Sequence, residues 1–174
     1  SLLVFALMHP QKINKISKTK TKGYDIIMAV DLSRSMLALD FTSTFERKTR
    51  LDAVKEVATK FITDRQNDRI GLVLFGNSAY LQTPLTTDVT TVATMLESAE
   101  IGMAGKNTAI GDAIALSVKN LKDRQEGSRV LILLTDGTNT AGEINPLEAA
   151  EIAAEYGIKI YSIGVGTNAS VPFP

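Results

Sequence analysis

The residues of this sequence with the clearest chemical potential are carboxylates and hydroxyls that follow two apolar segments. In "DIIMAVDLSRSM" the apolar run of residues 26–30 stops at Asp31, and Ser33 and Ser35 follow at alternate positions. In "RVLILLTDGTN" a second apolar run leads to Asp136. Alternate spacing lets the two serine hydroxyls point the same way from an extended turn, beside the carboxylate of Asp31. A group of neutral and anionic oxygens of this kind favours Mg²⁺ or Mn²⁺.

The elements that must position these residues alternate along the chain. Continuous apolar runs indicate strands buried on both faces, and apolar residues at helical spacing indicate amphipathic helices. The expected strands are residues 24–30, 69–76, 79–85, 129–135 and 158–166, and the expected helices are residues 50–65, 88–98, 108–123 and 145–157. Asn77 and Ser78 alone separate the second strand from the third, so these two strands should form an antiparallel hairpin. The order predicts an α/β fold: a doubly wound, mostly parallel sheet with one antiparallel edge strand and helices on both faces.

In such a sheet, ligands bind beyond the carboxyl ends of the strands, at the point where the strand order reverses. In the common order 3-2-1-4-5 the first and fourth strands are neighbours there, so Asp31 and Asp136 should face one crevice. The loop "GMAGKNTAIGD" enters a helix at the same edge and offers Thr108. The predicted metal site is therefore Asp31, Ser33, Ser35, Thr108 and Asp136. Because two carboxylates serve it, a bound ion would stay electron-poor and would accept a further anionic oxygen from a partner.

Each of these residues also has an ordinary structural interpretation. Asp31 could be a strand-end residue or a helix cap, Thr108 could be the N-cap of the helix that follows it, and Asp136 in "TDGTN" could form a turn. These separate interpretations do not predict that all the residues meet at one edge of a sheet. Asp40 is expected either to support the site loop or, more simply, to make a turn or a solvated contact, and Asp112 is expected to be a solvated helix residue.

Composition excludes several other classes of function. The chain has 174 residues, about the size of one domain, with 19 basic and 19 acidic residues, so its net charge gives no argument for nucleic-acid binding. Cysteine is absent, which excludes disulfides, thiolate metal sites and cysteine nucleophiles. The single histidine, His9, makes a Ser-His-Asp triad or a histidine-rich zinc site untenable.

The N-terminal segment differs in composition from the rest of the chain. The apolar stretch "SLLVFALM" precedes the lysine-rich stretch "HPQKINKISKTKTK". Eight residues are too few to span a bilayer, which takes roughly 20. Two interpretations stay open: an arm packed on the domain, or the end of a membrane helix followed by its basic flank. We therefore divide the chain into an N-terminal arm, residues 1–23, and a domain, residues 24–174.

Three motifs in the sequence resemble a known family. "DLSRS", the threonine of "GKNTAIGDAI", and "LLTDG" resemble, in order, the three parts of the metal-ion-dependent adhesion site of von Willebrand factor A domains. The resemblance runs over about residues 24–166. The segments "DRIGLVLFGNSAYLQTPLTTD" and "AAEIAAEYGIKIYSIGVGT" are similar to the bacterial aerotolerance (Bat) proteins, and to the BatA type most of all.

The resemblance implies a Rossmann-like fold and a binding rather than a catalytic activity. The same five residues would form the metal site, with the serines and the threonine bound directly to Mg²⁺ or Mn²⁺ and the aspartates often acting through water. The ion would receive an Asp or Glu from a partner protein. A full A domain has a sixth strand and a final helix, whereas this sequence ends after the fifth strand, so we expect a domain truncated at its C-terminus.

Bat-type proteins are similar to components that are anchored in a membrane. The genes of these components lie beside that of a MoxR-type AAA+ ATPase, and the components are linked to stress or oxygen tolerance. Their anchors flank the domain, which favours the membrane-helix interpretation of "SLLVFALM". The resemblance therefore implies a protein of the bacterial inner membrane. The lysines favour the cytoplasmic side, whereas the family is usually placed on the periplasmic side, and we expect the latter. Other Bat proteins and the ATPase system are the expected partners.

The surface around the ion offers candidate residues for contact with a partner. Met36, Lys106 and Asn107 are candidates for contact with a partner, although Met36 could instead lie in the core and loop exposure alone would explain the other two.

A strand-end Asp31 followed by x-Ser-x-Ser distantly resembles phosphatases of the haloacid dehalogenase type, which use Mg²⁺. Those enzymes have a second acid where this chain has Ser33, and no G-x-x-x-x-G-K-[ST] motif occurs. We therefore expect no enzyme.

Overall fold

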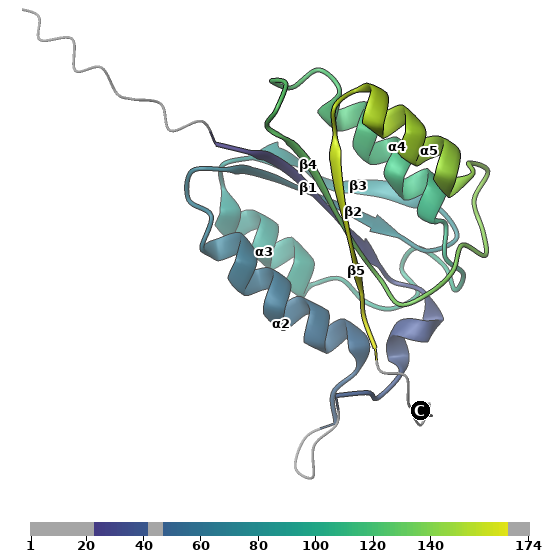
Figure 1. Cartoon of the computed structure of the whole chain (residues 1–174). Coiled ribbons are helices and arrows are strands. Elements are labelled where there is room, and N and C mark those ends of the chain that lie inside the picture. The colour runs from purple at the N-terminus through teal and green to yellow at the C-terminus, as the bar shows by residue number, and fades with distance from the viewer. Residues whose placement is uncertain (1–22, 42–46, 167–174) are drawn as a thin grey trace, which may run out of the picture.

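The computed structural model of the chain describes residues 23–41 and 47–166 (Figure 1). Its elements are β1 (Asp25–Asp31), the 3₁₀ helix η1 (Arg34–Leu37), α2 (Arg50–Thr63), β2 (Arg69–Phe75), β3 (Ala79–Thr86), α3 (Val89–Glu97), α4 (Ile110–Leu121), β4 (Arg129–Thr135), α5 (Pro146–Glu155) and β5 (Lys159–Gly164). All predicted strands and helices are present, in the predicted order. The short helix η1 was not predicted, and it carries Ser35 of the predicted metal site.

The five strands form one sheet in the order β3-β2-β1-β4-β5. The β2–β3 pair is antiparallel and the other pairs are parallel, as the sequence predicts. Val30 of β1 pairs with Leu134 of β4, so both central strands end at the same level of the sheet. The residues that follow these strand ends therefore lie next to each other, at the place where the strand order reverses.

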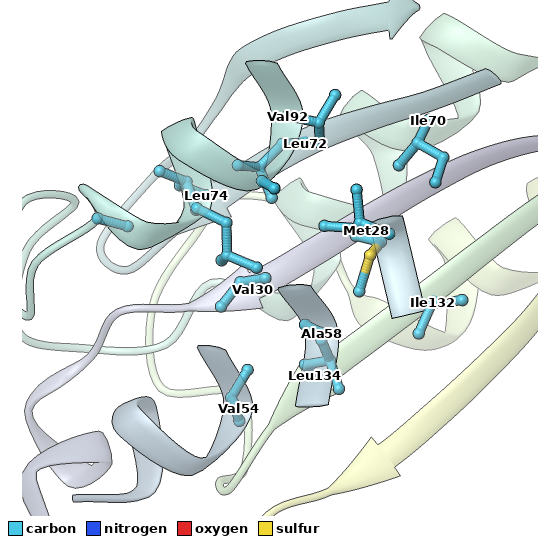
Figure 2. Close-up of a cluster of buried hydrophobic side chains, with 14 of the residues drawn as sticks. Met28, Val30, Val54, Ala58, Ile70, Leu72, Leu74, Val92, Ile132 and Leu134 are labelled. Atoms are coloured by element: carbon cyan, nitrogen blue, oxygen red, sulfur yellow. The ribbon is translucent and has the colours of Figure 1, made fainter. Parts of the chain in front are cut away.

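The core lies on both faces of the sheet, because successive residues of β1 point to opposite sides. Ile26, Met28 and Val30 join one buried cluster with residues of α2 and α3, while Ile27 and Ala29 join another with residues of α4 and α5. In Figure 1 the two helix pairs cover opposite faces of the sheet. Figure 2 shows the first cluster, in which side chains of three parallel strands meet those of α2 and α3. This packing on both faces explains the continuous apolar runs in the sequence.

Strand β5 forms the edge of the described sheet opposite to β3. Tyr161 and Ile163 on this strand are 55% and 49% exposed. The expected lack of a further strand and helix concerns the chain after residue 166, which lies outside the described residues. The interpretations of the N-terminal arm likewise fall on residues 1–22, outside the described part. Within residues 23–41 and 47–166, no helix is long and apolar enough to cross a membrane.

Candidate metal site

Asp31 is the last residue of β1 and is completely buried. Its Oδ1 accepts a hydrogen bond from the backbone N–H of Ser33 at 2.8 Å, and its Oδ2 accepts one from the hydroxyl of Thr135 at 2.6 Å. Thr135 ends the neighbouring strand β4, so strand pairing delivers this hydroxyl to the carboxylate. Burial raises the pKa of Asp31 above its usual value, although both hydrogen bonds act to lower it. A buried carboxylate in this state is stabilised by a nearby positive charge.

Ser33 and Ser35 present their hydroxyls from a tight turn rather than from the extended turn that the sequence predicted. Ser33 is extended and caps η1, and the backbone N–H of Met36 donates to its carbonyl oxygen at 3.1 Å. The two serine hydroxyl oxygens nevertheless lie 2.9 Å apart. The hydroxyl of Ser35 also donates to Oδ1 of Asp136 at 2.6 Å, which joins the turn after β1 to the loop after β4. The structure thus brings these two serines together with both aspartates.

Asp136 is held on its other side by an arginine that the sequence analysis missed. Nη1 of Arg50 donates to Oδ2 of Asp136 at 2.7 Å, and Nη2 of Arg50 lies 2.9 Å from Oδ2 of Asp40. The side chains of both aspartates are 0% exposed. Asp40 lies in a turn, as one interpretation expected, but its side chain forms a buried ion pair with Arg50 instead of a solvated contact. Arg50 is the first residue of α2, where the helix dipole disfavours a cation. This unfavourable position was the signal in the sequence that Arg50 has another role.

Thr108 is buried in the loop between α3 and α4. Its hydroxyl lies 3.8 Å from the position that a Cβ on Gly137 would take, so Thr108 faces the residue directly after Asp136. The backbone N–H groups of Thr140 and Ala141 donate to its carbonyl oxygen at 2.9 and 3.1 Å. Thr108 is thus fixed against the loop after β4, next to the residue that follows Asp136.

The interpretation of Thr108 as a helix cap was wrong, because α4 begins at Ile110 and its N-cap position is Ala109. The backbone N–H of Ile110 instead donates to the side-chain oxygen of Asn139 at 2.8 Å. Asp112, expected to be solvated, accepts from the backbone N–H groups of Glu143 and Ile144, each at 3.0 Å. Hydrogen bonds therefore join the start of α4 to the loop after β4.

The candidate partner-contact residues separate into two groups. Met36 is completely buried in the cluster that includes Val30 and Leu74, so its assignment to the partner surface was wrong and the core interpretation is correct. Lys106 and Asn107 are exposed. The carbonyl oxygen of Lys106 accepts from the backbone N–H of Arg34 at 3.1 Å, which places this loop next to the serine turn. Lys106 and Asn107 are therefore exposed next to the serine turn, as the sequence analysis expected.

The donor set fits a small hard cation. Octahedral Mg²⁺, with ligands at roughly 2.0–2.1 Å, places adjacent ligand oxygens about 2.9 Å apart. The hydroxyl oxygens of Ser33 and Ser35 are 2.9 Å apart, and Ser35 Oγ is 2.6 Å from the nearer oxygen of Asp136. These are also hydrogen-bond distances, so the oxygens would need little movement to turn their lone pairs from these hydrogen bonds to an ion. In the described ranges, no group of three or more His, Cys, Asp or Glu could hold a metal, so a cation here would need neutral oxygen ligands beside the two carboxylates.

Replacing Asp31 with asparagine should not destabilise the metal-free protein. Because burial raises the pKa of Asp31, the folded state binds its proton more tightly than the unfolded chain does. The wild-type carboxylate therefore reduces stability as the pH rises above its ordinary pKa of 3.8. In chelator at pH 7, urea denaturation should show Asp31→Asn to be equally stable or more stable, by about 1 kcal/mol. A clear loss of stability would mean that the charged form is stabilised without any ion.

The comparison with known families identifies the class to which this fold and site belong. The sequence profile of the von Willebrand factor type A domain matches residues 25–171. The chain therefore belongs to the von Willebrand factor type A domain family. The resemblance that the sequence motifs suggested, and the Rossmann-like α/β fold that it implied, are both confirmed.

Similar proteins narrow this assignment. An uncharacterized protein of Borreliella burgdorferi is 35% identical over 167 residues, which are 96% of this chain and 48% of that protein. The chain thus spans about half the length of this relative. The structure of an aerotolerance-related membrane protein from Bacteroides fragilis is similar with a TM-score of 0.76 and 33% identity, over 87% of this chain and 72% of that chain. The chain is therefore related to the aerotolerance proteins.

A more distant structure shares the fold alone. Proximal thread matrix protein 1 from the mussel byssus, in a form described as having a zinc-occupied metal-ion-dependent adhesion site motif, is similar with a TM-score of 0.64 and 21% identity. The match covers 82% of this chain and 38% of that one.

Proposed function

We propose that this domain binds one divalent cation, Mg²⁺ or Mn²⁺, and through it a carboxylate of a partner protein. Asp31, Ser33, Ser35, Thr108 and Asp136 are the residues that would hold the ion. The observation that carries the proposal is the hydrogen bond from Ser35 to Asp136, which spans 101 positions of the sequence and joins the turn after β1 to the loop after β4. The two parts of a metal site, one from each of these segments, would be expected to meet in this way.

With three neutral hydroxyls and two carboxylates as its ligands, a divalent ion would have few negatively charged ligands. A carboxylate from a partner would complete its coordination shell, because hard cations prefer oxygen ligands and bind charged ones most strongly. Lys106 and Asn107 lie exposed on the loop beside the serine turn and would contact the same partner. The interaction would be directional and would disappear when the metal is removed.

Calorimetric titration with Mg²⁺ and Mn²⁺ tests this function. Wild type should bind one ion with saturation, and both Asp31→Ala and Ser35→Ala should weaken binding at least about tenfold, because each removes an oxygen donor. Asp123→Ala, at an exposed position after α4, is the matched control and should bind as wild type does. Equal binding by all variants would place the ion elsewhere on the protein and refute the proposed site.

We further propose that the domain acts in a membrane-anchored bacterial complex related to aerotolerance or stress, on the periplasmic side of the inner membrane. The similar Bacteroides fragilis structure is described as that of an aerotolerance-related membrane protein, which supports the setting. Acidic surfaces of other Bat proteins, or of components that work with a MoxR-type AAA+ ATPase, are the partners that this proposal implies.

The alternative function, a Mg²⁺-dependent phosphatase that uses Asp31 as nucleophile, has less support. Asp31 is completely buried, and both of its oxygens accept hydrogen bonds, from the Ser33 N–H and the Thr135 hydroxyl. A nucleophile needs a free oxygen directed at the substrate, and a general acid is needed beside it. A phosphatase assay on generic phosphate monoesters separates the two functions: turnover that Asp31→Asn abolishes would favour the enzyme.

A further inference from the structure

Arg50 is shared between two buried carboxylates at the edge of the metal site. Its Nη1 donates to Asp136 at 2.7 Å and its Nη2 lies 2.9 Å from Asp40. The arginine side chain is 16% exposed, and both aspartate side chains are 0% exposed. Screening by water is weak for charges buried to this extent, so the charge of Arg50 acts strongly on its surroundings.

The surroundings keep the guanidinium in this place. Gly166, where the chain leaves β5, lies so close that a Cβ there would be 3.0 Å from Arg50 Cζ and 3.0 Å from Asp40 Oδ2. The backbone N–H of Val165 donates to the carbonyl oxygen of Thr135 at 3.0 Å, which fixes this part of the chain against the end of β4. The arginine is therefore enclosed between α2, the end of β4 and the exit of β5.

Arg50 and a bound ion would both interact with the carboxylate of Asp136. One oxygen of Asp136 accepts from Ser35 at 2.6 Å, on the side of the proposed ion, while the other accepts from Arg50 at 2.7 Å. A single carboxylate group thus separates the guanidinium from the metal donors. Two cations this close repel each other in a poorly screened environment. Asp40 moderates the repulsion, because it shares the positive charge from the far side.

We propose that Arg50 is a resident counter-ion of the metal site: it stabilises Asp136 while no ion is bound, and it lowers the affinity of the site for a divalent cation. The inference rests on the proposed metal-binding function and deepens it. A site with reduced affinity for the ion depends more on the carboxylate of a partner, so Arg50 couples ion binding to partner binding. Asp40 sets how much of the arginine charge the ion experiences.

The test is the direction in which two single substitutions change Mg²⁺ affinity, measured by calorimetry. Arg50→Gln removes the positive charge and should bind Mg²⁺ at least about fivefold more tightly than wild type. Asp40→Asn removes one of the two carboxylates that share the arginine charge and should bind Mg²⁺ more weakly. Arg50→Lys keeps the charge and should stay close to wild type. If the ion pairs served structure alone, Arg50→Gln and Asp40→Asn would both weaken binding, because both disrupt the site.

Thermal unfolding gives a second readout. In chelator Arg50→Gln should melt at a lower temperature than wild type, because Asp136 loses its buried partner. Saturating Mg²⁺ should raise its melting temperature by more than that of wild type, since the ion then replaces the missing charge. Binding by wild type that Asp31→Ala abolishes, together with unchanged or weaker binding by Arg50→Gln, would overturn this inference and leave the metal site intact. Absence of binding in both wild type and Arg50→Gln would overturn the metal site and this inference with it.

Discussion

Replacing Gly111 with alanine should reduce the free energy of unfolding by about 3 kcal/mol or more, or prevent folding altogether. An added Cβ would lie 1.8 Å from the carbonyl oxygen of Ile144 and 2.6 Å from its carbonyl carbon. These are backbone atoms, and Asp112 fixes their segment by accepting from the N–H groups of Glu143 and Ile144. The loop therefore cannot move aside without losing its contacts with α4. Chemical denaturation measures the loss directly.

A second glycine provides the matched control for this substitution. Around Gly164, at the end of β5, no described atom lies within 4 Å of an added Cβ, and its φ is not in the left-handed region. Gly164→Ala should therefore change stability by less than about 1 kcal/mol. If Gly111→Ala were as stable as wild type, the close approach of the segment around Ile144 to α4 would not exist in solution.

Replacing Met36 with alanine should reduce the free energy of unfolding by about 2–4 kcal/mol and should also weaken Mg²⁺ binding. Met36 is 0% exposed and packs in the core cluster beneath the turn that carries Ser33 and Ser35. Truncation leaves a cavity under this turn, so the two hydroxyls lose their fixed separation. Urea denaturation and calorimetry on the same samples measure the two effects.

The conservative variant separates packing from any direct role of the sulfur atom. Met36→Leu fills nearly the same volume and should restore most of both the stability and the affinity. Val57→Ala, on a residue that is 71% exposed, controls for the loss of an apolar side chain and should change neither quantity. Weaker partner binding by Met36→Ala at unchanged stability and unchanged metal affinity would return Met36 to the partner surface.

The fold was predictable because its strongest signals are local and agree with one another. The continuous apolar run before Asp31 indicated a strand covered on both faces, and helices pack on both sides of β1. The two-residue link Asn77-Ser78 required the hairpin that makes β3 antiparallel. Gly157 ended the last helix as expected, with φ at 63°. The start of α4 was misplaced by two residues, because its cap, Asn139, comes from a distant loop.

The candidate site was predictable to the extent that topology alone determines it. Residues at the ends of two neighbouring parallel strands must meet, and Asp31 and Asp136 follow from that rule. The contacts of Arg50 and Thr135 depend on side chains that approach across the sheet and from α2, and no spacing in the sequence encodes them. The sequence left Met36 open between the core and the partner surface, because its burial depends on the 3₁₀ turn that carries the side chain inward.

The long sequence separation between the contacts of the site also has a kinetic consequence. Ser35 meets Asp136 across 101 positions, and Thr135 meets Asp31 across 104. Such contacts close a large loop, so they form when β4 takes its place beside β1 and are absent from the unfolded chain. A cation that needs both strand ends can bind the native state alone. We expect such an ion to prolong the lifetime of the folded domain by slowing its unfolding, with little effect on the rate at which the chain folds.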